Sequence, residues 1–215
     1  MLVIFDLDGT LLNTIDDLSA AANHALWSYG FAPRSVEECR SFVGNGVPKL
    51  LERALPETAR TPENLERMRG EFFAYYDAHL WDKTRPYGNI SAILTALQGR
   101  NIKLAVASNK YQRATQRLVE HFFPRVSFAA VLGQRENVPT KPNPQIVQEI
   151  LSLTNEPREH TLYVGDSGVD MQTAQNAGVT ACGVTWGFRA RAELAAYHPA
   201  HLIDSPYQLL DLVMQ

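Results

Sequence analysis

The sequence predicts an α/β protein, in which a doubly wound parallel sheet carries an inserted, all-helical block. Three observations lead to this prediction. A short apolar run opens the chain, a long stretch after it shows only helical periodicity, and from residue 85 onward strand and helix patterns alternate. Such alternation is typical of parallel sheets with right-handed crossovers.

The opening run ends abruptly in carboxylates. Leu2–Phe5 is short and contains β-branched residues, a pattern typical of a buried strand in a parallel sheet. Asp6 and Asp8 follow, and Gly9 allows the chain to turn. Two carboxylates at the end of a buried strand are costly unless a cation neutralises them. Because ligands usually bind at the carboxyl ends of such strands, we expect a metal-assisted acidic site here.

The next stretch, from residue 14 to residue 81, shows a pattern typical of helices and of no other element. Apolar residues at helical spacing predict a helix from Thr14 to Ser28. Ser35, with Glu38 three residues later, predicts a capping box and a short helix that the sequence Gly44-Asn45-Gly46 breaks. Further helices are expected from Val47 to Leu55 and from Pro62 to Trp81, both as parts of the same block. These residues contain no convincing strand.

The rest of the chain alternates. The expected strands are Ile102–Ala107, Phe128–Leu132, Thr161–Val164, Ala181–Val184 and His201–Ile203. The expected helices are Ile90–Leu97, Tyr111–His121, one that Asn143-Pro144 begins and that reaches Leu153, Val169–Ala177 and Pro206–Val213. The first strand must join this sheet. We therefore expect residues 1–13 and 83–215 to form a Rossmann-like core, and residues 14–82 to form an inserted helical cap domain.

Composition narrows the function. The chain has 215 residues and a net charge of −3, and it contains no basic block. Nucleic-acid and anionic-membrane binding therefore have no compositional support. Cys39 and Cys182 lie far apart, which fits a reducing compartment better than a disulfide framework. With no visible signal peptide and no membrane-length apolar stretch, we expect a cytoplasmic protein that is a monomer or homodimer.

Polar residues follow the carboxyl ends of the predicted strands, which share one edge of a parallel sheet. They are Asp6 and Asp8, Ser108 and Asn109, Lys141, and Asp166 with Asp170. The three aspartates Asp6, Asp8 and Asp166 offer the oxygen ligands that Mg²⁺ prefers. Lys141 and the Ser108 hydroxyl suit an anionic group such as a phosphate. A carboxylate can also accept a phosphoryl group and so divide hydrolysis into two steps.

The combination resembles the four motifs of the haloacid dehalogenase-like hydrolase superfamily. The motifs are Asp6-Leu7-Asp8-Gly9-Thr10, Ser108, Lys141 and Gly165-Asp166 with Asp170. The resemblance implies that Asp6 is the nucleophile and Asp8 the general acid and base. It also implies that Ser108, Asn109 and Lys141 bind the phosphoryl group. Mg²⁺ would be held by Asp6, the Asp8 carbonyl and Asp166, with Asp170 ordering the surroundings of the metal or Lys141. A helical cap after the first motif is a feature of the same superfamily.

Within the superfamily, the chain is most similar to phosphoglycolate phosphatases. The pieces that carry this similarity are Phe42 to Leu55, Ser108-Asn109-Lys110 and Val184 to Phe188. The resemblance implies a substrate-specificity loop at Gly44-Asn45-Gly46 and a small phosphorylated metabolite, 2-phosphoglycolate, as substrate. The expected substrate contacts are Thr10, Gly44, Asn45 and Lys49. Arg85 to Asn89 departs from the family pattern at the return from the cap.

Other interpretations stay open. A phosphosugar mutase of the β-phosphoglucomutase type would share the same motifs. A phospho-signalling receiver also uses Asp, Ser or Thr and Lys around Mg²⁺, but such a domain is shorter and takes its phosphoacceptor from a later strand. A binding protein that has lost activity is a further alternative. Taken alone, Lys49 and Lys141 could each be an ordinary surface lysine, and Asn45 could be a turn residue.

Overall fold

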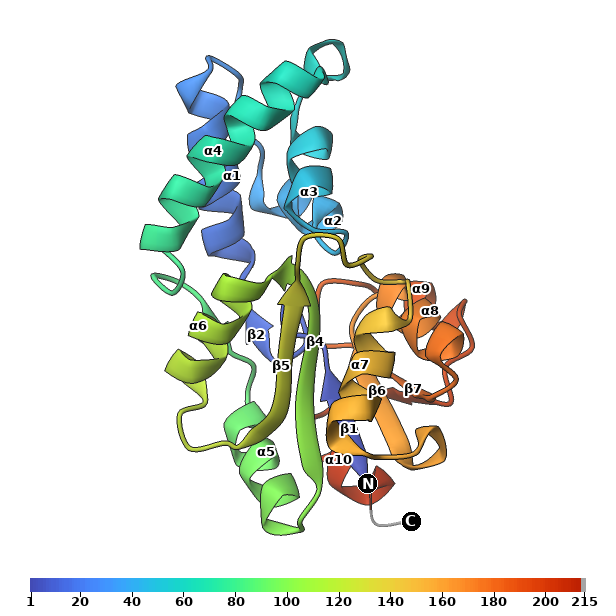
Figure 1. Ribbon diagram of the computed structural model, residues 1–215. Coiled ribbons are helices and arrows are strands. Elements are labelled where there is room, and N and C mark those ends of the chain that lie inside the picture. Colours follow the sequence, from blue (N-terminus) through green and yellow to red (C-terminus); the bar gives the residue numbers. More distant parts are fainter. Residues whose placement is uncertain (214–215) are drawn as a thin grey trace. The chain divides into compact units, whose positions relative to one another are not determined.

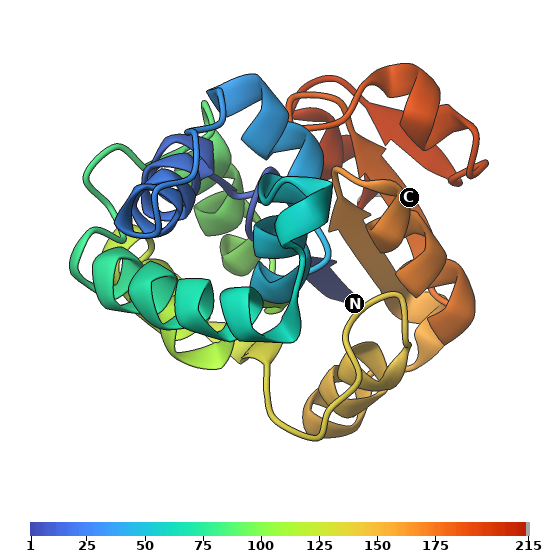
Figure 2. The same ribbon diagram turned by 90° about the horizontal axis from the view of Figure 1, so that it is seen from above.

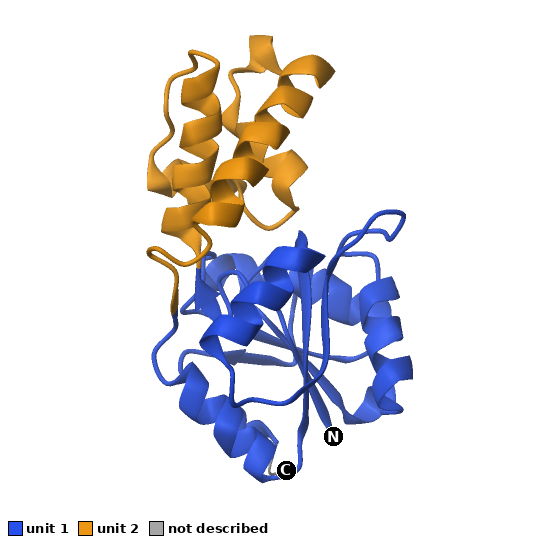
Figure 3. Cartoon of the chain, turned by 60° about the vertical axis from the view of Figure 1, so that its left-hand side comes forward, with its two compact units in different colours: residues 1–13, 86–215 blue, residues 14–85 orange. Residues whose placement is uncertain are grey.

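The structure is a computed structural model that describes residues 1–213. The chain forms two compact units (Figure 3). One unit joins Met1–Asn13 with the chain from Pro86 onward, and the other spans Thr14–Arg85. Within the described residues, no helix combines the length and the apolar content needed to cross a membrane.

The larger unit is built on a sheet that has six strands in the described residues, in the order β5-β4-β1-β6-β7-β8. Figure 1 labels the first five strands of this order. The strands are β1 (Leu2–Phe5), β4 (Lys103–Tyr111), β5 (Phe128–Gln134), β6 (Thr161–Gly165), β7 (Thr180–Val184) and β8 (His201–Ile203). Every neighbouring pair runs parallel. The predicted α/β class with a parallel sheet is confirmed.

Helices cover both faces of this sheet. They are α5 (Ile90–Gly99), α6 (Gln112–Phe122), α7 (Gln145–Thr154), α8 (Gly168–Ala177), α9 (Arg191–Ala195) and α10 (Gln208–Leu212). Leu2 and Ile4 pack in one buried cluster with side chains of α7 and α8. Because successive residues of a strand face opposite sides, Val3 and Phe5 point to the other face, the side of α5 and α6 (Figures 1 and 2).

The structure corrects two predictions near the site. The strand expected to end before Ser108 continues to Tyr111, although its pairing with β5 shifts register between Ala107 and Tyr111. Polar residues usually end a strand, but here contacts from other segments hold them extended. Helix α7 begins at Gln145 with Pro144 as its N-cap residue, whereas Asn143 accepts a hydrogen bond from the Gln145 N–H.

The smaller unit is helical, as its sequence pattern predicts. Its helices are α1 (Ile15–Ser28), α2 (Val36–Phe42), α3 (Val47–Ala54) and α4 (Pro62–Ala78), with a 3₁₀ turn at Glu57–Ala59. The capping box of Ser35 and Glu38 is present. Helix α4 ends three residues before the predicted Trp81. Short strands β2 (Leu12–Asn13) and β3 (Arg85–Pro86) pair where the chain leaves and re-enters the larger unit.

Candidate active site

Four predicted residues from distant parts of the chain meet at the carboxyl ends of β1 and β6. Asp6 follows β1, Asp166 follows β6, and Asp170 lies in the first turn of α8. Lys141, from the loop before α7, places its Nζ 2.9 Å from Asp6 Oδ1 and 2.7 Å from Asp170 Oδ1. One carboxylate oxygen from each aspartate lies within 4.8 Å of the other two. All four side chains are buried.

The protons of Lys141 leave one carboxylate oxygen without a donor. The ammonium donates to Asp170 Oδ1, to the Ala107 carbonyl at 3.0 Å and to Tyr163 Oη at 3.0 Å. Since an ammonium has only three protons, Asp6 Oδ1 receives charge from Lys141 but no hydrogen bond. A buried carboxylate oxygen of this kind needs another partner, and a bound cation is one.

Asp166 is fixed by backbone and hydroxyl donors. Its Oδ1 accepts from Thr10 Oγ1 at 3.1 Å, and its Oδ2 accepts from the Phe188 N–H at 2.7 Å. Gly9, at a φ of 88°, and Gly187 lie so close to this carboxylate that a Cβ at either position would collide with it. The two glycines therefore let the backbone close around Asp166. Thr10, a residue of the first predicted motif, thereby contacts the acidic cluster and helps to position the Asp166 carboxylate.

Both carboxylate oxygens of Asp170 have structural partners. Its Oδ2 accepts from Ser167 Oγ at 2.5 Å and from the Ser167 N–H at 3.1 Å, which completes a capping box at the start of α8. Its Oδ1 pairs with Lys141 and lies 3.3 Å from Tyr163 Oη. Both oxygens are therefore engaged, so Asp170 is better placed to hold Lys141 than to bind a metal directly.

The end of β4 contributes three successive side chains. Ser108 Oγ accepts from the Lys110 N–H at 3.2 Å. Asn109 accepts from the Lys141 N–H at 2.8 Å and donates to the Lys141 carbonyl at 3.2 Å, so it fixes the backbone that carries Lys141. Lys110 Nζ lies 3.1 Å from each carboxylate oxygen of Asp8. The Asp8 carboxylate is thus paired with Lys110 and is not part of the Asp6–Asp166–Asp170 cluster.

Burial and like charges dominate the electrostatics of the cluster. Burial raises the pKa of Asp6 to about 7; Lys141 opposes this shift and Asp170 adds to it. Burial, followed by the charges of Asp170 and Asp6, also holds the pKa of Asp166 well above its usual range. Burial alone would lower the pKa of Lys141, but Asp170 and Asp6 raise it well above its ordinary value. Lys141 therefore stays a cation, while the carboxylates lack full charge compensation.

This imbalance fits a divalent cation. Asp6 and Asp166 present hard oxygen ligands, the type that Mg²⁺ prefers, and Asp6 Oδ1 has no donor of its own. A cation of charge +2 would stabilise the ionised forms that burial opposes. The donor set therefore suits the metal that the sequence predicts.

The predicted residues of the helical unit make local contacts. Lys49 Nζ lies 2.6 Å from Glu52 Oε2, and both side chains are exposed. Asn45 Oδ1 accepts from Arg53 at 3.0 Å, and the same guanidinium donates to the Phe42 carbonyl at 2.7 Å. Gly44 and Gly46 flank Asn45 with φ values of 122° and 82°. Arg53 thus organises the loop that contains Gly44 and Asn45, two of the predicted substrate contacts.

Three contributors to the site are not predicted as such by the sequence. Lys110 belongs to a segment that carries the family resemblance but has no predicted role, Tyr163 lies inside β6, and the Phe188 N–H has no sequence signature. Tyr163 had one available signal, because a buried tyrosine usually finds a hydrogen-bond partner. It lies two residues before the end of the strand that leads to Asp166.

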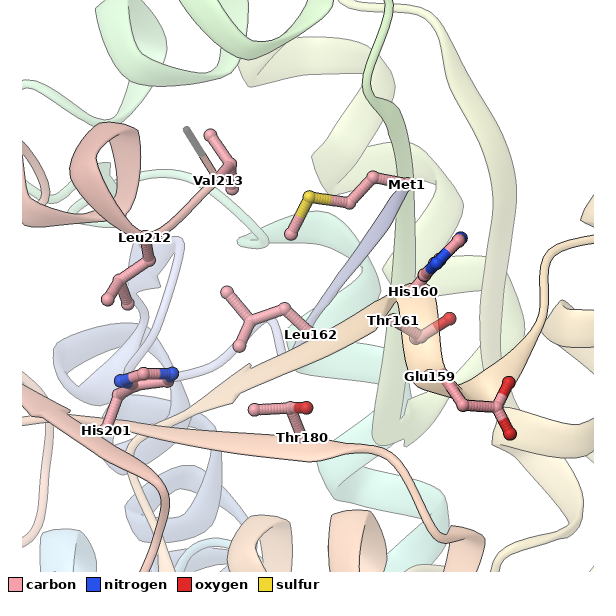
Figure 4. A pocket seen from close by; sticks show the side chains of 9 residues that line it. All are labelled: Met1, Glu159, His160, Thr161, Leu162, Thr180, His201, Leu212 and Val213. Atoms are coloured by element: carbon pink, nitrogen blue, oxygen red, sulfur yellow. The ribbon is translucent and has the colours of Figure 1, made fainter. Parts of the chain in front are cut away.

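A separate cavity lies at the opposite edge of the sheet (Figure 4). The residues that line it are Met1, Glu159, His160, Thr161, Leu162, Thr180, His201, Leu212 and Val213. They include the first residues of β6, β7 and β8, whereas Asp6 and Asp166 follow the carboxyl ends of their strands. Within residues 1–213, no buried polar atom without a partner belongs to this lining. The cavity therefore lacks the chemistry of the acidic cluster.

Comparison with known proteins agrees with the geometry. Residues 3–184 match the family model of the haloacid dehalogenase-like hydrolases. A protein of Cereibacter sphaeroides named phosphoglycolate phosphatase is 34% identical over 189 residues, 87% of this chain and 86% of that protein. A protein of the same name from Psychrobacter arcticus is 30% identical over 221 residues, 100% of this chain and 96% of that one.

A solved structure shares the fold. A crystal structure of a Lactobacillus delbrueckii subsp. bulgaricus protein superposes with a TM-score of 0.93 at 32% sequence identity, covering 99% of this chain and 97% of that one. The family match spans the predicted motifs, and Asp6, Asp166 and Asp170 from these motifs meet in one buried cluster. The expected resemblance is thereby confirmed, and so is the prediction of an enzyme of the hydrolase class. The chain belongs to the haloacid dehalogenase-like hydrolase family.

Proposed function

We propose that this protein is a Mg²⁺-dependent phosphatase, which hydrolyses a small phosphorylated metabolite through an aspartyl-phosphate on Asp6. The observation that carries the proposal is the surroundings of Asp6. Its buried Oδ1 lies 2.9 Å from the Lys141 ammonium, receives no hydrogen bond, and belongs to a cluster of carboxylates suited to a cation. An ionised carboxylate that is held beside a cation in this way can act as the nucleophile toward phosphorus.

Asp6 and Asp8 divide the chemistry. A carboxylate oxygen of Asp6 forms a bond to phosphorus while the bond to the leaving oxygen breaks. The electron pair of that bond stays on the leaving oxygen, which takes a proton from Asp8. In the second step Asp8 accepts a proton from water as the water oxygen attacks phosphorus. The bond between phosphorus and Asp6 then breaks, inorganic phosphate leaves, and Asp8 is protonated for the next cycle.

Lys141, Ser108 and Asn109 handle the phosphoryl group. Lys141 keeps its positive charge beside Asp6, where it opposes the negative charge that develops on the equatorial oxygens. The Ser108 hydroxyl has its own proton to donate to a phosphoryl oxygen. Asn109 keeps the Lys141 backbone in place through two hydrogen bonds. Mg²⁺ held by Asp6 and Asp166, and by the Asp8 carbonyl that the family resemblance implies, would supply further positive charge at this point.

The substrate class is drawn from the relatives. Two similar proteins bear the name phosphoglycolate phosphatase, and this supports 2-phosphoglycolate as the favoured substrate. We assign the helical unit the role of a mobile cap that excludes water and selects the substrate. Gly44, Asn45 and Lys49 are its proposed substrate contacts, and Thr10 is one in the core. A cytoplasmic location and a monomeric or homodimeric state are part of the same proposal.

The test is a phosphate-release assay on the purified full chain. The panel contains 2-phosphoglycolate, β-glucose 1-phosphate and p-nitrophenyl phosphate, each with Mg²⁺ and with EDTA. We expect release of inorganic phosphate that requires Mg²⁺ and is fastest with 2-phosphoglycolate. The Asp6→Asn variant should fold normally and release none, whereas Asp16→Asn, an exposed position on α1, should behave as wild type.

Two outcomes would overturn the proposal. Mg²⁺-dependent phosphate release that survives Asp6→Asn would exclude Asp6 as the nucleophile. Formation of a hexose 6-phosphate from β-glucose 1-phosphate, without free phosphate, would identify a phosphosugar mutase in place of a phosphatase.

A further inference from the structure

Lys110 is a buried cation in the core that the proposed chemistry does not use. Only 2% of its side chain is exposed, and its Nζ lies 3.1 Å from both carboxylate oxygens of Asp8. Asp8 is 102 residues away in sequence. The contact is therefore a product of the fold, made between the loop after β1 and the end of β4.

The backbone of Lys110 is fixed from several sides. Its N–H donates to Ser108 Oγ, and its carbonyl accepts from Thr115 Oγ1 of α6 at 3.1 Å. Gly133 of β5 packs so closely that a Cβ there would come 2.6 Å from the Lys110 carbonyl oxygen. The backbone of Lys110 is thus held by its own strand, by a helix and by a neighbouring strand. The side chain that carries the ammonium therefore starts from a fixed point.

Asp8 is held at the other end of the contact. The Gly9 N–H donates to the Leu12 carbonyl at 2.8 Å, and Asp8 forms a bridge with Leu12. This turn fixes the backbone of Asp8, and the contact with Lys110 is made by its side chain. Equal distances of 3.1 Å from Nζ to both oxygens place the ammonium symmetrically in front of the carboxylate, so it restricts the directions in which this group can point.

A buried ion pair is a poor source of stability, because desolvation of two charges cancels much of their attraction. Orientation is a better explanation for this one. A general acid must lie within hydrogen-bond reach of the leaving oxygen, and small displacements are costly to the rate. We propose that Lys110 is a positioning residue that orients the carboxyl group of Asp8 toward the leaving oxygen of the substrate. This inference rests on the proposed function, in which Asp8 gives its proton to that oxygen.

The chemistry of the leaving group provides the test. An alkyl alcohol leaves poorly unless it is protonated, whereas p-nitrophenolate leaves readily as an anion. The ratio kcat/KM reports the steps through departure of the leaving group. A displaced general acid should therefore lower kcat/KM for alkyl phosphates and spare p-nitrophenyl phosphate. A general loss of structure would lower both together.

The experiment compares wild type with Lys110→Met and Lys110→Arg on three substrates. These are 2-phosphoglycolate, 2-hydroxyethyl phosphate, which has a hydroxymethyl group in place of the carboxylate, and p-nitrophenyl phosphate. We expect Lys110→Met to lower kcat/KM for both alkyl esters on the order of 100-fold, the size of a general-acid contribution. For p-nitrophenyl phosphate the change should stay below about 5-fold, and Lys110→Arg should recover part of the loss. Lys103→Met is the matched control, because Lys103 lies on the same strand and pairs with Glu156 at the opposite edge.

A double variant guards against misfolding. Asp8→Asn with Lys110→Met removes both charges, so neither is left buried alone. If Lys110 acts through Asp8, the double variant should be no slower on alkyl esters than Asp8→Asn alone. An additional loss in the double variant would overturn the proposal, and so would an equal loss on all three substrates.

Two further results would also refute it. A loss confined to 2-phosphoglycolate would make Lys110 a contact for the substrate carboxylate, and unchanged kinetics would leave it no role. Failure of the proposed function has a different signature, namely wild-type protein that releases no phosphate or an active Asp6→Asn variant.

Discussion

The ammonium of Lys141 lies 2.7 Å from Oδ1 of Asp170, and both side chains are almost completely withdrawn from solvent. The same ammonium approaches Asp6, so one cation is shared between two buried carboxylates. Because both carboxylates rely on this cation, its removal should disturb the core more than removal of a surface charge.

Replacement of Lys141 by Met should destabilise the metal-free protein by about 3 to 5 kcal/mol near neutral pH, the cost of buried charges that lose their partner. The loss should shrink at lower pH, since the raised pKa of Asp6, about 7, allows this carboxyl group to take up a proton. Urea denaturation with EDTA at two pH values measures both effects. Lys49→Met removes an exposed pair with Glu52 and should leave the midpoint unchanged. A similar shift in both variants would contradict the shared-cation explanation.

Metal binding should depend on pH. The pKa of Asp6 rises from 3.8 to about 7 on folding. The folded state then holds more protons between these values, so this contribution to stability is present below 3.8 and is lost as the pH rises through about 7. Mg²⁺ needs the ionised carboxylates, and its stabilising effect should grow over the same range.

Thermal unfolding with Mg²⁺ and with EDTA, at about pH 5.5 and about pH 8, tests this expectation. The increase in Tm on adding Mg²⁺ should be larger at the higher pH. Without metal at the higher pH, Asp6→Asn should be more stable than wild type, because the substitution removes a buried charge that lies near Asp170. Equal Mg²⁺ effects at both pH values would argue against a role of Asp6 in binding.

Gly187 should tolerate no side chain. An added Cβ would collide with Asp166 and with the carbonyl of Gly9, so Gly187→Ala must displace the carboxylate that Thr10 and the Phe188 N–H hold. We expect Mg²⁺ affinity to fall at least about 10-fold, as for other lost supports of metal ligands. Titration calorimetry measures it. Gly70→Ala, in open space within α4, should leave the affinity unchanged and stabilise the helix. Unchanged affinity in Gly187→Ala would remove Asp166 from the metal site.

The sequence predicts those site residues whose position follows from the end of a strand. A parallel sheet brings its carboxyl ends to one edge, so locating β1, β6 and the loop before α7 was sufficient to expect Asp6, Asp166 and Lys141 together. The alternation of patterns likewise predicted the sheet, because the strands carry short apolar runs such as Leu2–Phe5.

Contacts that depend on three-dimensional packing could not be predicted in this way. The polar run Ser108 to Lys110 reads as a loop, but the fold keeps it extended because its side chains bind Asp8 and Lys141. The backbone N–H of Phe188 has no side-chain signature at all. Asp17 is a third example, since an acidic residue in the first turn of a helix usually indicates only a favourable helix end.

Asp17 should be essential to the helical unit. It is buried on α1, and its carboxylate accepts from the Lys83 N–H at 3.1 Å, the Thr84 N–H at 2.8 Å and Thr84 Oγ1 at 2.7 Å. Asp17→Ala would leave these donors without an acceptor, at a cost of about 2 to 4 kcal/mol. Hydrogen exchange of the Lys83 and Thr84 amides should accelerate strongly, while Asp17→Asn, which keeps one carbonyl acceptor, should show a smaller effect. The exposed neighbour Asp16→Ala provides the control, and amides that stay protected in Asp17→Ala would show that other contacts hold this segment.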